Sequence, residues 1–307
     1  MNIASIDIGT NTILLLIAEV NKRNKTITPL LNRYSIPRIG KGLVRGEKIK
    51  VSQIELLFNV LNEYADIITR YNCEKVISTA TNAFRISTNG TEIADEINRK
   101  YNFKVNIISG KDEARLSYLG AISDTKFNSL NLVIDIGGGS TEIVFGNGNE
   151  IYSRESFPVG VVRGTEQYFH HDPPLSEEIA NFKNMLSIIF NSLKSNKIKA
   201  DNILAIAGTP TTLACLKQNL SVYDEKQIEG SSLSYDEIKI FIKKLSALST
   251  SQILEKYNAV VKGREDILLC GTIILHTLMR ILNLEQVNVS SKGIRFGAIV
   301  NYLLTEP

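Results

Sequence analysis

Short apolar runs alternate along the chain with longer stretches in which apolar residues recur at helical spacing, a pattern typical of an α/β protein. Ser52 and Thr91 stand where two of the helical stretches begin and are predicted N-caps. We predict strands at residues 3–6, 13–18, 26–34, 76–77, 105–108, 132–134, 143–145, 203–207 and 287–289, and helices at residues 52–70, 91–100, 110–122, 161–169, 176–193, 208–216, 234–248, 263–282 and 293–304.

One turn between two apolar runs carries unusual chemistry. Residues 135–142 are Asp-Ile-Gly-Gly-Gly-Ser-Thr-Glu, and the three glycines let the backbone turn its N–H groups toward an anion. Ser140 adds a hydroxyl donor. Asp135 would repel a bare phosphate, which suggests a divalent cation between them or a water held by the carboxylate. Taken alone, the stretch fits an ordinary glycine-rich hairpin with exposed acids equally well.

A second copy of this pattern favours the phosphate interpretation. At the N-terminus an apolar run leads into Asp7-Ile8-Gly9-Thr10-Asn11-Thr12 and then into the apolar run 13–18. Two similar hairpins, one opening each half of the chain, indicate a duplicated domain with a cleft between the copies. Such hairpins would hold a phosphate chain from both sides and would bring Asp7 and Asp135 near the same metal ion.

The chain is long enough for two domains, each with its own core. The polar segment 123–129 is the candidate boundary. We therefore expect an N-terminal domain at residues 1–124 and a C-terminal domain at residues 125–292, with the last helix, about residues 293–307, packing back on the first domain.

Charge and cysteine usage narrow the class of protein. The formal net charge of +3 gives no sign of a nucleic-acid or membrane surface, so any basic site must be local. Three widely spaced cysteines without a CxxC pair indicate a reducing compartment. No leader segment is apparent, and the longest apolar run, residues 13–18, is too short to cross a bilayer. We expect a cytoplasmic protein.

A third turn, Ala207-Gly208-Thr209-Pro210-Thr211-Thr212, leads from a predicted buried strand into a helix. Glycine and hydroxyl residues at a helix N-terminus favour anion binding through free N–H groups and the helix dipole. An ordinary capped turn is the simpler explanation for this segment on its own.

Taken together, the motifs resemble the exopolyphosphatase and guanosine pentaphosphate phosphohydrolase (Ppx/GppA) family of the actin-like phosphotransferase superfamily. The resemblance covers nearly the whole chain and implies two actin-like (ribonuclease H-like) domains, with mixed sheets flanked by helices and an active site in the cleft between them. Six motifs follow the family's order: residues 7–12, 80–85, 109–116, the Gly137 hairpin, the Gly208 turn and residues 291–295.

The resemblance also implies roles for individual residues. Glu113 matches the family's catalytic glutamate, which orients or deprotonates the attacking water, and Glu142 is its partner in the same cleft. Asp7 and Asp135 are the expected metal-side carboxylates, with Mg²⁺ or another divalent cation as the cofactor. The residues assigned to phosphate binding are Gly9, Thr10, Asn11, Arg85, Gly137, Gly138, Gly139, Ser140, Gly208, Thr209 and Arg264.

Two features bear on the substrate. Where the family often has arginine or histidine after its first phosphate turn, this chain has Leu14, so one cationic contact is missing. Arg38 and Gly40 resemble a family segment beside the cleft, and the basic stretch that follows, up to Lys50, would either guide a polyanion or form a solvated loop.

The predicted function is metal-dependent removal of the terminal phosphate from inorganic polyphosphate. Guanosine pentaphosphate is the alternative substrate, and a non-catalytic sensor of guanosine tetra- or pentaphosphate is an alternative of another class. An actin-like sugar kinase is a third option, which the paired acids Glu113 and Glu142 disfavour because a kinase must keep water away from phosphate. We expect no nucleic-acid or membrane partner, and a homodimer stays open.

Overall fold

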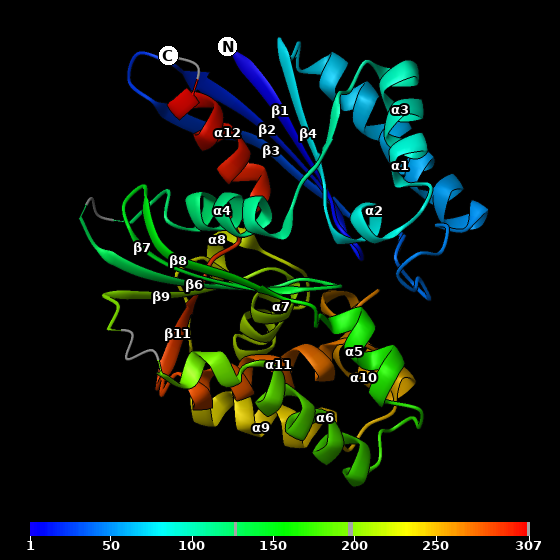
Figure 1. Cartoon of the computed structure of the whole chain (residues 1–307), viewed down its shortest axis with the longest axis vertical. Helices are drawn as coiled ribbons and strands as arrows, with labels where there is room; N and C mark the ends of the chain where they lie inside the picture. The colour runs from blue at the N-terminus through cyan, green and yellow to red at the C-terminus, as the bar shows by residue number, and fades with distance from the viewer. Residues whose placement is uncertain (126–127, 196–198, 306–307) are drawn as a thin grey trace. The chain divides into compact units, whose positions relative to one another are not determined.

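The computed structural model describes residues 1–125, 128–195 and 199–305, which form two compact units (Figure 1). Unit 1 consists of Met1–Ser123 together with the C-terminal segment from Lys292, and unit 2 consists of Asp124–Ser291. Each unit contains one mixed β-sheet flanked by helices, which confirms the predicted fold class. None of the helices in the described ranges combines the length and apolar composition needed to cross a membrane.

The sheet of unit 1 has the strand order β3-β2-β1-β4-β5. The first three strands form an antiparallel meander, and β4 and β5 run parallel to β1. The strand bounds are β1 Asn2–Ile8, β2 Ile13–Asn21, β3 Thr26–Ser35, β4 Lys75–Ala80 and β5 Val105–Ile107, and the helix bounds are α1 Val51–Arg70, α2 Asn82–Ile86, α3 Gly90–Tyr101, α4 Gly110–Ala121 and α12 Ile294–Thr305.

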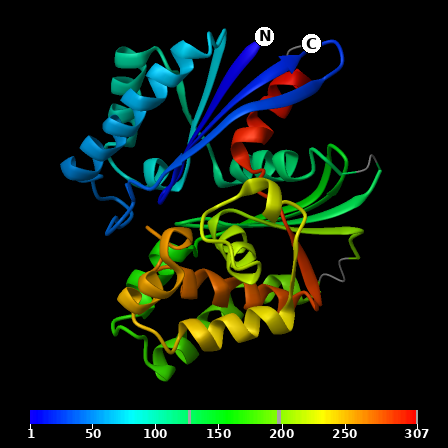
Figure 2. The same ribbon diagram turned by 180° about the vertical axis from the view of Figure 1, so that it is seen from behind.

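Helices cover both faces of this sheet because alternate residues of its strands are apolar on each side. On one face, α1 and α3 pack against strand residues such as Ile6 and Leu15. On the other face, α12 packs against Ile3 and Leu16. Helices α4 and α12 lie side by side in both views (Figure 1 and Figure 2).

Small residues permit the close approach of α4 and α12. A Cβ atom on Gly297 would collide with the carbonyl group of Leu116, and one on Gly120 would collide with the backbone of Gly293. Arg115 donates from Nη1 to Asn301 Oδ1 across the same contact at 2.6 Å. The last helix is therefore part of unit 1, although more than half of the chain separates it from α4 in sequence.

The sheet of unit 2 has the order β10-β11-β9-β6-β7-β8. Strands β6, β7 and β8 form an antiparallel meander, and β9 and β11 continue the sheet parallel to β6. The bounds are β6 Leu130–Ile136, β7 Thr141–Asn147, β8 Glu150–Phe157, β9 Asn202–Ile206, β10 Ser232–Ser234 and β11 Gln286–Val289, with helices α5 Val161–Tyr168, α6 Ser176–Ile189, α7 Gly208–Lys217, α8 Glu225–Ile228, α9 Tyr235–Leu245, α10 Thr250–Tyr257 and α11 Leu268–Ile281 and short 3₁₀ segments at Asn191–Ser195 and Asn258–Val260.

The two sheets share one plan. Each begins, in sequence order, with an antiparallel hairpin. A later strand then pairs in parallel with the free side of the hairpin's first strand. The hairpin registers are also equivalent, because Asp7 pairs with Leu14 in unit 1 just as Asp135 pairs with Glu142 in unit 2. Leu14 thus occupies in the first hairpin the position that Glu142 occupies in the second.

Three predicted helix starts differ from the structure for identifiable reasons. Helix α1 starts one residue early, with Lys50 as N-cap, and the Ser52 hydroxyl contacts the Gln53 side chain instead of capping. Helix α3 starts at Gly90 rather than after Thr91, and its N-cap Asn89 exchanges hydrogen bonds with the backbone of Ile49.

Helix α11 starts at Leu268 instead of residue 263. Gly263 has φ +79°, in the left-handed region, and cannot belong to a right-handed helix. Arg264 therefore lies in the turns that precede this helix rather than on it.

Candidate functional site

In unit 1 the candidate residues gather at one edge of the sheet. Because β1, β4 and β5 are parallel neighbours, their carboxyl ends meet there: Asp7 pairs with Thr79, and Ala80 pairs with Ile107. The first phosphate turn follows β1, Arg85 follows β4 on α2, and Glu113 follows β5 on α4. The carboxyl edge of parallel strands is the usual place for ligands in α/β sheets.

The first phosphate turn is the four-residue loop between β1 and β2, residues 9–12. The Gly9 amide donates to the Thr12 carbonyl at 3.0 Å, which closes the loop. Asn11 is 5% exposed, and its Oδ1 atom has no hydrogen-bond partner among the described residues. A buried amide oxygen without a partner costs about 1–3 kcal/mol, so its retention suggests a ligand or water at this point.

The segment after β3 supports this turn from behind. The Arg38 amide donates to the Asn11 carbonyl at 3.1 Å, and the Gly40 amide donates to the Thr10 carbonyl at 2.9 Å. Glycine is required at position 40, since a Cβ there would collide with the Thr10 methyl group. The carbonyl groups of Thr10 and Asn11 are therefore fixed by hydrogen bonds to the segment that follows β3.

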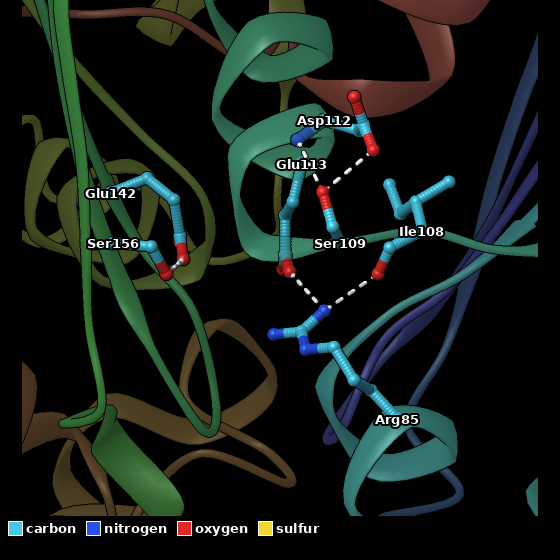
Figure 3. Close-up of polar contacts among 7 residues, drawn as sticks. All are labelled: Arg85, Ile108, Ser109, Asp112, Glu113, Glu142 and Ser156. Carbon is cyan, nitrogen blue, oxygen red and sulfur yellow. Dashed lines mark hydrogen bonds and ion pairs between the residues drawn. The ribbon is translucent and has the colours of Figure 1, made fainter.

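Arg85 and Glu113, predicted as a phosphate ligand and as the glutamate that orients or deprotonates the water, form an ion pair (Figure 3). Arg85 Nη1 lies 2.9 Å from Glu113 Oε2 and donates to the Ile108 carbonyl at 2.9 Å. The Glu113 side chain is 8% exposed and that of Arg85 is 23% exposed. Across the described ranges, Arg85 Nε and Nη2 make no hydrogen bond, so a second side of the guanidinium can bind an anion.

The N-terminus of α4 determines where Glu113 stands. Ser109 is the N-cap, and its hydroxyl accepts from the Asp112 amide at 3.2 Å and donates to the Asp112 carboxylate at 2.6 Å (Figure 3). The Glu113 amide donates to the Ser109 carbonyl at 2.8 Å. Carboxylates in the first turn are favoured by the helix dipole, and of these two only Glu113 is buried.

Residues 137–140, between β6 and β7, form the glycine turn of unit 2. It is closed by the same hydrogen bond as the first turn, here from the Gly137 amide to the Ser140 carbonyl at 3.0 Å. The first amides of α5 donate to the carbonyls of Gly137 and Gly138 at 3.0 and 2.9 Å. The amides of Gly138 and Gly139 donate no hydrogen bond within residues 1–125, 128–195 and 199–305. This arrangement of free N–H groups matches the anion nests formed by glycine-rich turns.

Two further features complete this turn. A Cβ atom on Gly160, directly before α5, would lie 2.5 Å from backbone atoms of Gly138 and Gly139, so only glycine allows the helix to approach. Ser140 is 3% exposed, and its hydroxyl has no partner in the described part of the chain. The buried hydroxyl is available to a ligand in the turn.

Glu142 is among the most buried charged residues, with 1% exposure. Its Oε1 atom accepts from the Ser156 hydroxyl on β8 at 2.7 Å (Figure 3). Thr141 is anchored by a 2.6 Å hydrogen bond from its hydroxyl to the Val159 carbonyl. A buried carboxylate held in this way has a defined orientation.

The third turn brings together two residues that are distant in sequence. Gly208 begins α7, and the Arg264 guanidinium lies where a Cβ of Gly208 would be. Ala207 has φ +74°, an unusual conformation for a residue with a side chain, and provides no side-chain cap. The Thr209 hydroxyl is buried against Gly271. Since β9 neighbours β6, this turn and the glycine turn lie at the same sheet edge.

The predicted metal ligands fit a particular mode of binding. Asp7 and Asp135 each end the first strand of a hairpin and are each 8% exposed. Among the described residues there is no group of three or more His, Cys, Asp or Glu side chains that would hold a metal by itself. Mg²⁺ is usually bound by one or two carboxylates together with substrate phosphates and water, and these residues supply suitable oxygen donors for that mode.

The candidate residues thus form two sets, one at the carboxyl edge of each sheet. Unit 1 brings together Asp7, its turn, Arg85 and Glu113, and unit 2 brings together Asp135, its turn, Glu142 and the Gly208–Arg264 pair.

Sequence reasoning missed Ser156 and Gly160. Alternation along β8 predicts which residues share a face, but no signal in the sequence identifies Glu142 as the partner of Ser156.

Each of the two α/β sheets begins with a hairpin whose glycine- and hydroxyl-containing turn lies at the carboxyl edge of the sheet. The chain belongs to the Ppx/GppA phosphatase family, whose model matches residues 16–306. This confirms the family that the six motifs predict.

Individual relatives agree with this assignment. The chain is 29% identical to exopolyphosphatase 2 of Mycobacterium tuberculosis over 96% of each protein. It is 33% identical over 97% of its own length to a bifunctional 3-dehydroquinate synthase/phosphatase of Fusobacterium nucleatum, but it spans only 46% of that protein. The whole activity of that bifunctional relative therefore does not transfer.

Solved structures show the same fold. The Aquifex aeolicus member of the Ppx/GppA family shares 31% identity, with a TM-score of 0.84 over 100% of this chain and 98% of the other. An exopolyphosphatase from Cytophaga hutchinsonii shares 26% identity, with a TM-score of 0.89 over 99% and 98% of the two chains.

Proposed function

We propose that this protein is an exopolyphosphatase that releases the terminal phosphate of inorganic polyphosphate. The observation that carries the proposal is the ion pair of the buried Glu113 with the partly exposed Arg85 at the same sheet edge as the Asp7 turn. Family membership and relatives named as exopolyphosphatases support the same reaction class.

Phosphoanhydride hydrolysis requires little covalent chemistry from the protein. The transferred phosphoryl group passes through a loose transition state, so catalysis depends on positioning the water and on stabilising charge on the phosphate oxygens. In this proposal, the free amides at Gly138 and Gly139 and the Ser140 hydroxyl donate to phosphate oxygens. At the first turn, Asn11 donates to phosphate through Nδ2, while its Oδ1, which has no partner among the described residues, accepts a hydrogen bond from water. Arg264, beside Gly208, adds a cationic contact to the phosphate chain.

Glu113 orients the attacking water. Arg85 Nη1 donates to Glu113 Oε2 and fixes the direction of the carboxylate. A carboxylate held in this way can accept a hydrogen bond from water early and take the proton late, as a loose transition state requires. Arg85 therefore has two tasks: it positions Glu113 through Nη1, and its other nitrogens bind the phosphate that departs.

Glu142 is the second carboxylate of the proposed site. Held by Ser156, it has a fixed orientation in which it binds a water or contributes to metal binding. We propose that Asp7 and Asp135 provide carboxylate oxygens for Mg²⁺ or another divalent cation. When bound, such an ion supplies positive charge that neutralises phosphate oxygens.

The test is phosphate release from polyphosphate with Mg²⁺, measured for wild type, Glu113→Gln and Glu92→Gln. Glu92 is a matched control because it is a glutamate in the first turn of another helix of unit 1, α3, and is exposed. We expect Glu113→Gln to lower kcat by about 10²–10⁴-fold and Glu92→Gln to have little effect. No release by the wild-type protein, or equal effects of the two variants, would contradict the proposal.

The same experiment separates the alternatives. Release from guanosine pentaphosphate but not from polyphosphate would identify the nucleotide as the substrate. A sensor without turnover would bind guanosine tetra- or pentaphosphate and would keep the same response in Glu113→Gln, whereas a hydrolase variant would retain binding and lose rate.

A further inference from the structure

A long irregular loop in unit 1 concentrates positive charge next to the first phosphate turn. Residues 36–50 lie between β3 and α1 without helix or strand. Loops longer than about 12–15 residues without regular structure are uncommon in compact domains and are usually functional. We call residues 37–50 the basic loop; it lies beside α2 in both views (Figure 1 and Figure 2).

The charge of this loop exceeds that of the entire protein. It has a formal net charge of +4 against +3 for the whole chain, so the remaining residues sum to −1. The charged residues of the loop are Arg38, Lys41, Arg45, Lys48 and Lys50, with Glu47 as its acid. Four of the five cations, all except Arg38, are exposed.

The basic loop is held at three points along its length, and the first two contact elements that carry residues of the proposed site. At its start, the amides of Arg38 and Gly40 bind the carbonyls of the first phosphate turn. Near its middle, the Gly46 amide donates to the Ile86 carbonyl at the end of α2, the helix that carries Arg85, at 2.9 Å. At its end, Ile49 is buried and exchanges backbone hydrogen bonds with the Asn89 side chain at 2.9 and 3.0 Å.

The loop's own contacts bring its charges together. Lys50 Nζ lies 3.6 Å from where a Cβ of Gly42 would be, so the end of the loop folds across its beginning beside Lys41. The Glu47 carboxylate accepts the Val44 amide at 3.2 Å. Holding like charges close together on a fixed backbone costs free energy, which a polyanion would recover.

We propose that the basic loop is a subsite for the more distant phosphates of a phosphate chain whose terminal phosphate lies at the first turn. This inference rests on the proposed function and adds to it a preference for longer chains. The loop contains no aromatic residue on which a base could stack, which favours bare phosphate over single-stranded nucleic acid.

The test compares two triple variants that remove equal charge. Lys41→Gln/Arg45→Gln/Lys48→Gln lowers the formal net charge of the loop from +4 to +1 and leaves the N-cap residue Lys50 intact. The control, Arg23→Gln/Lys25→Gln/Lys104→Gln, removes three exposed charges near the opposite edge of the same sheet. Both variants change the net charge of the protein by the same amount.

The first measurement is the binding of labelled long-chain polyphosphate without Mg²⁺, with an oligonucleotide of equal phosphate number as competitor. We expect the loop variant to weaken binding about tenfold, as three exposed ionic contacts allow, and to reduce its salt dependence, while the control binds like wild type. Equal losses in both variants, no loss in the loop variant, or equal competition by the oligonucleotide would overturn the inference.

The second measurement is phosphate release from long-chain polyphosphate and from tripolyphosphate. The loop variant should raise KM for the long chain by about tenfold and for tripolyphosphate by a smaller factor. Equal factors for both lengths would overturn the chain-length preference. If wild type binds the chain but releases no phosphate, the proposed hydrolase function fails, and the binding comparison still decides the role of the loop.

Discussion

Replacement of Arg85 by glutamine is the most informative perturbation of the proposed site, because it separates positioning of the catalytic carboxylate from phosphate binding. The variant removes the 2.9 Å contact to Glu113 and the 2.9 Å hydrogen bond to the Ile108 carbonyl. If Arg85 only binds phosphate, its loss affects KM. If it also positions Glu113, its loss affects kcat.

The structure provides the expected size of the effect on stability. Removing one partner of a fully buried ion pair costs about 3–5 kcal/mol, since the other charge is left without compensation. Arg85 is 23% exposed, so water can reach part of the vacated space and solvate Glu113. We therefore expect a loss of about 1–3 kcal/mol in the free energy of unfolding, close to the value of a hydrogen bond to a charged group.

The effect on the reaction should be larger than the effect on substrate affinity. A carboxylate that loses its positioning contact samples other orientations, and a misplacement of about 1 Å can cost about 10²-fold in rate.

The assay is phosphate release from polyphosphate at a series of substrate concentrations, combined with urea unfolding. Arg85→Lys serves as the conservative variant: it keeps the charge but loses the planar fork, so it should recover part of the lost stability while kcat stays low. Arg70→Gln, an exposed arginine at the end of α1, is the control for removal of charge. A raised KM with unchanged kcat in Arg85→Gln would refute the positioning role.

Four further predictions concern unit 2. Ser140→Ala should raise KM for polyphosphate without lowering the unfolding midpoint, because its buried hydroxyl has no partner among the described residues; a clear loss of stability would argue against a ligand-binding role. Gly160→Ala should both destabilise the protein by about 1–3 kcal/mol and raise KM, as seen by urea unfolding and kinetics, since its Cβ would displace the glycine turn. Ser156→Ala should reduce kcat and cost about 1–3 kcal/mol of stability by removing the hydrogen bond to Glu142; unchanged kcat would remove Glu142 from the reaction. Burial, aided by nearby cationic side chains, lowers the pKa of His276 to about 4. The unfolded state therefore binds the proton first, and stability should fall as the pH drops from about 6.5 toward 4. In unfolding experiments at pH 7 and pH 5, His276→Phe should weaken that fall by about 1 kcal/mol at pH 5, a value that allows for the partial exposure of the ring.

Local rules predicted the elements that depend on neighbours in the sequence. The two Asp-Ile-Gly turns are hairpins in equivalent registers, because glycine and hydroxyl residues between apolar runs suffice to specify a short turn. Helix starts were less accurate where tertiary contacts compete. Asn89 caps α3 while its side chain binds the backbone of Ile49, a partner that helical periodicity cannot reveal.

The sequence by itself determined the α/β class, the duplicated hairpins, the motif order that defines the family and the residue types available for phosphate chemistry. Only the tertiary structure decided that Arg85 holds Glu113, that Ser156 holds Glu142 and that Arg264 lies against Gly208. The physical reason is that a turn or helix depends on residues within a few positions of one another. These pairings depend instead on strand order and on close backbone approach, which bring distant parts of the chain to one edge of a sheet.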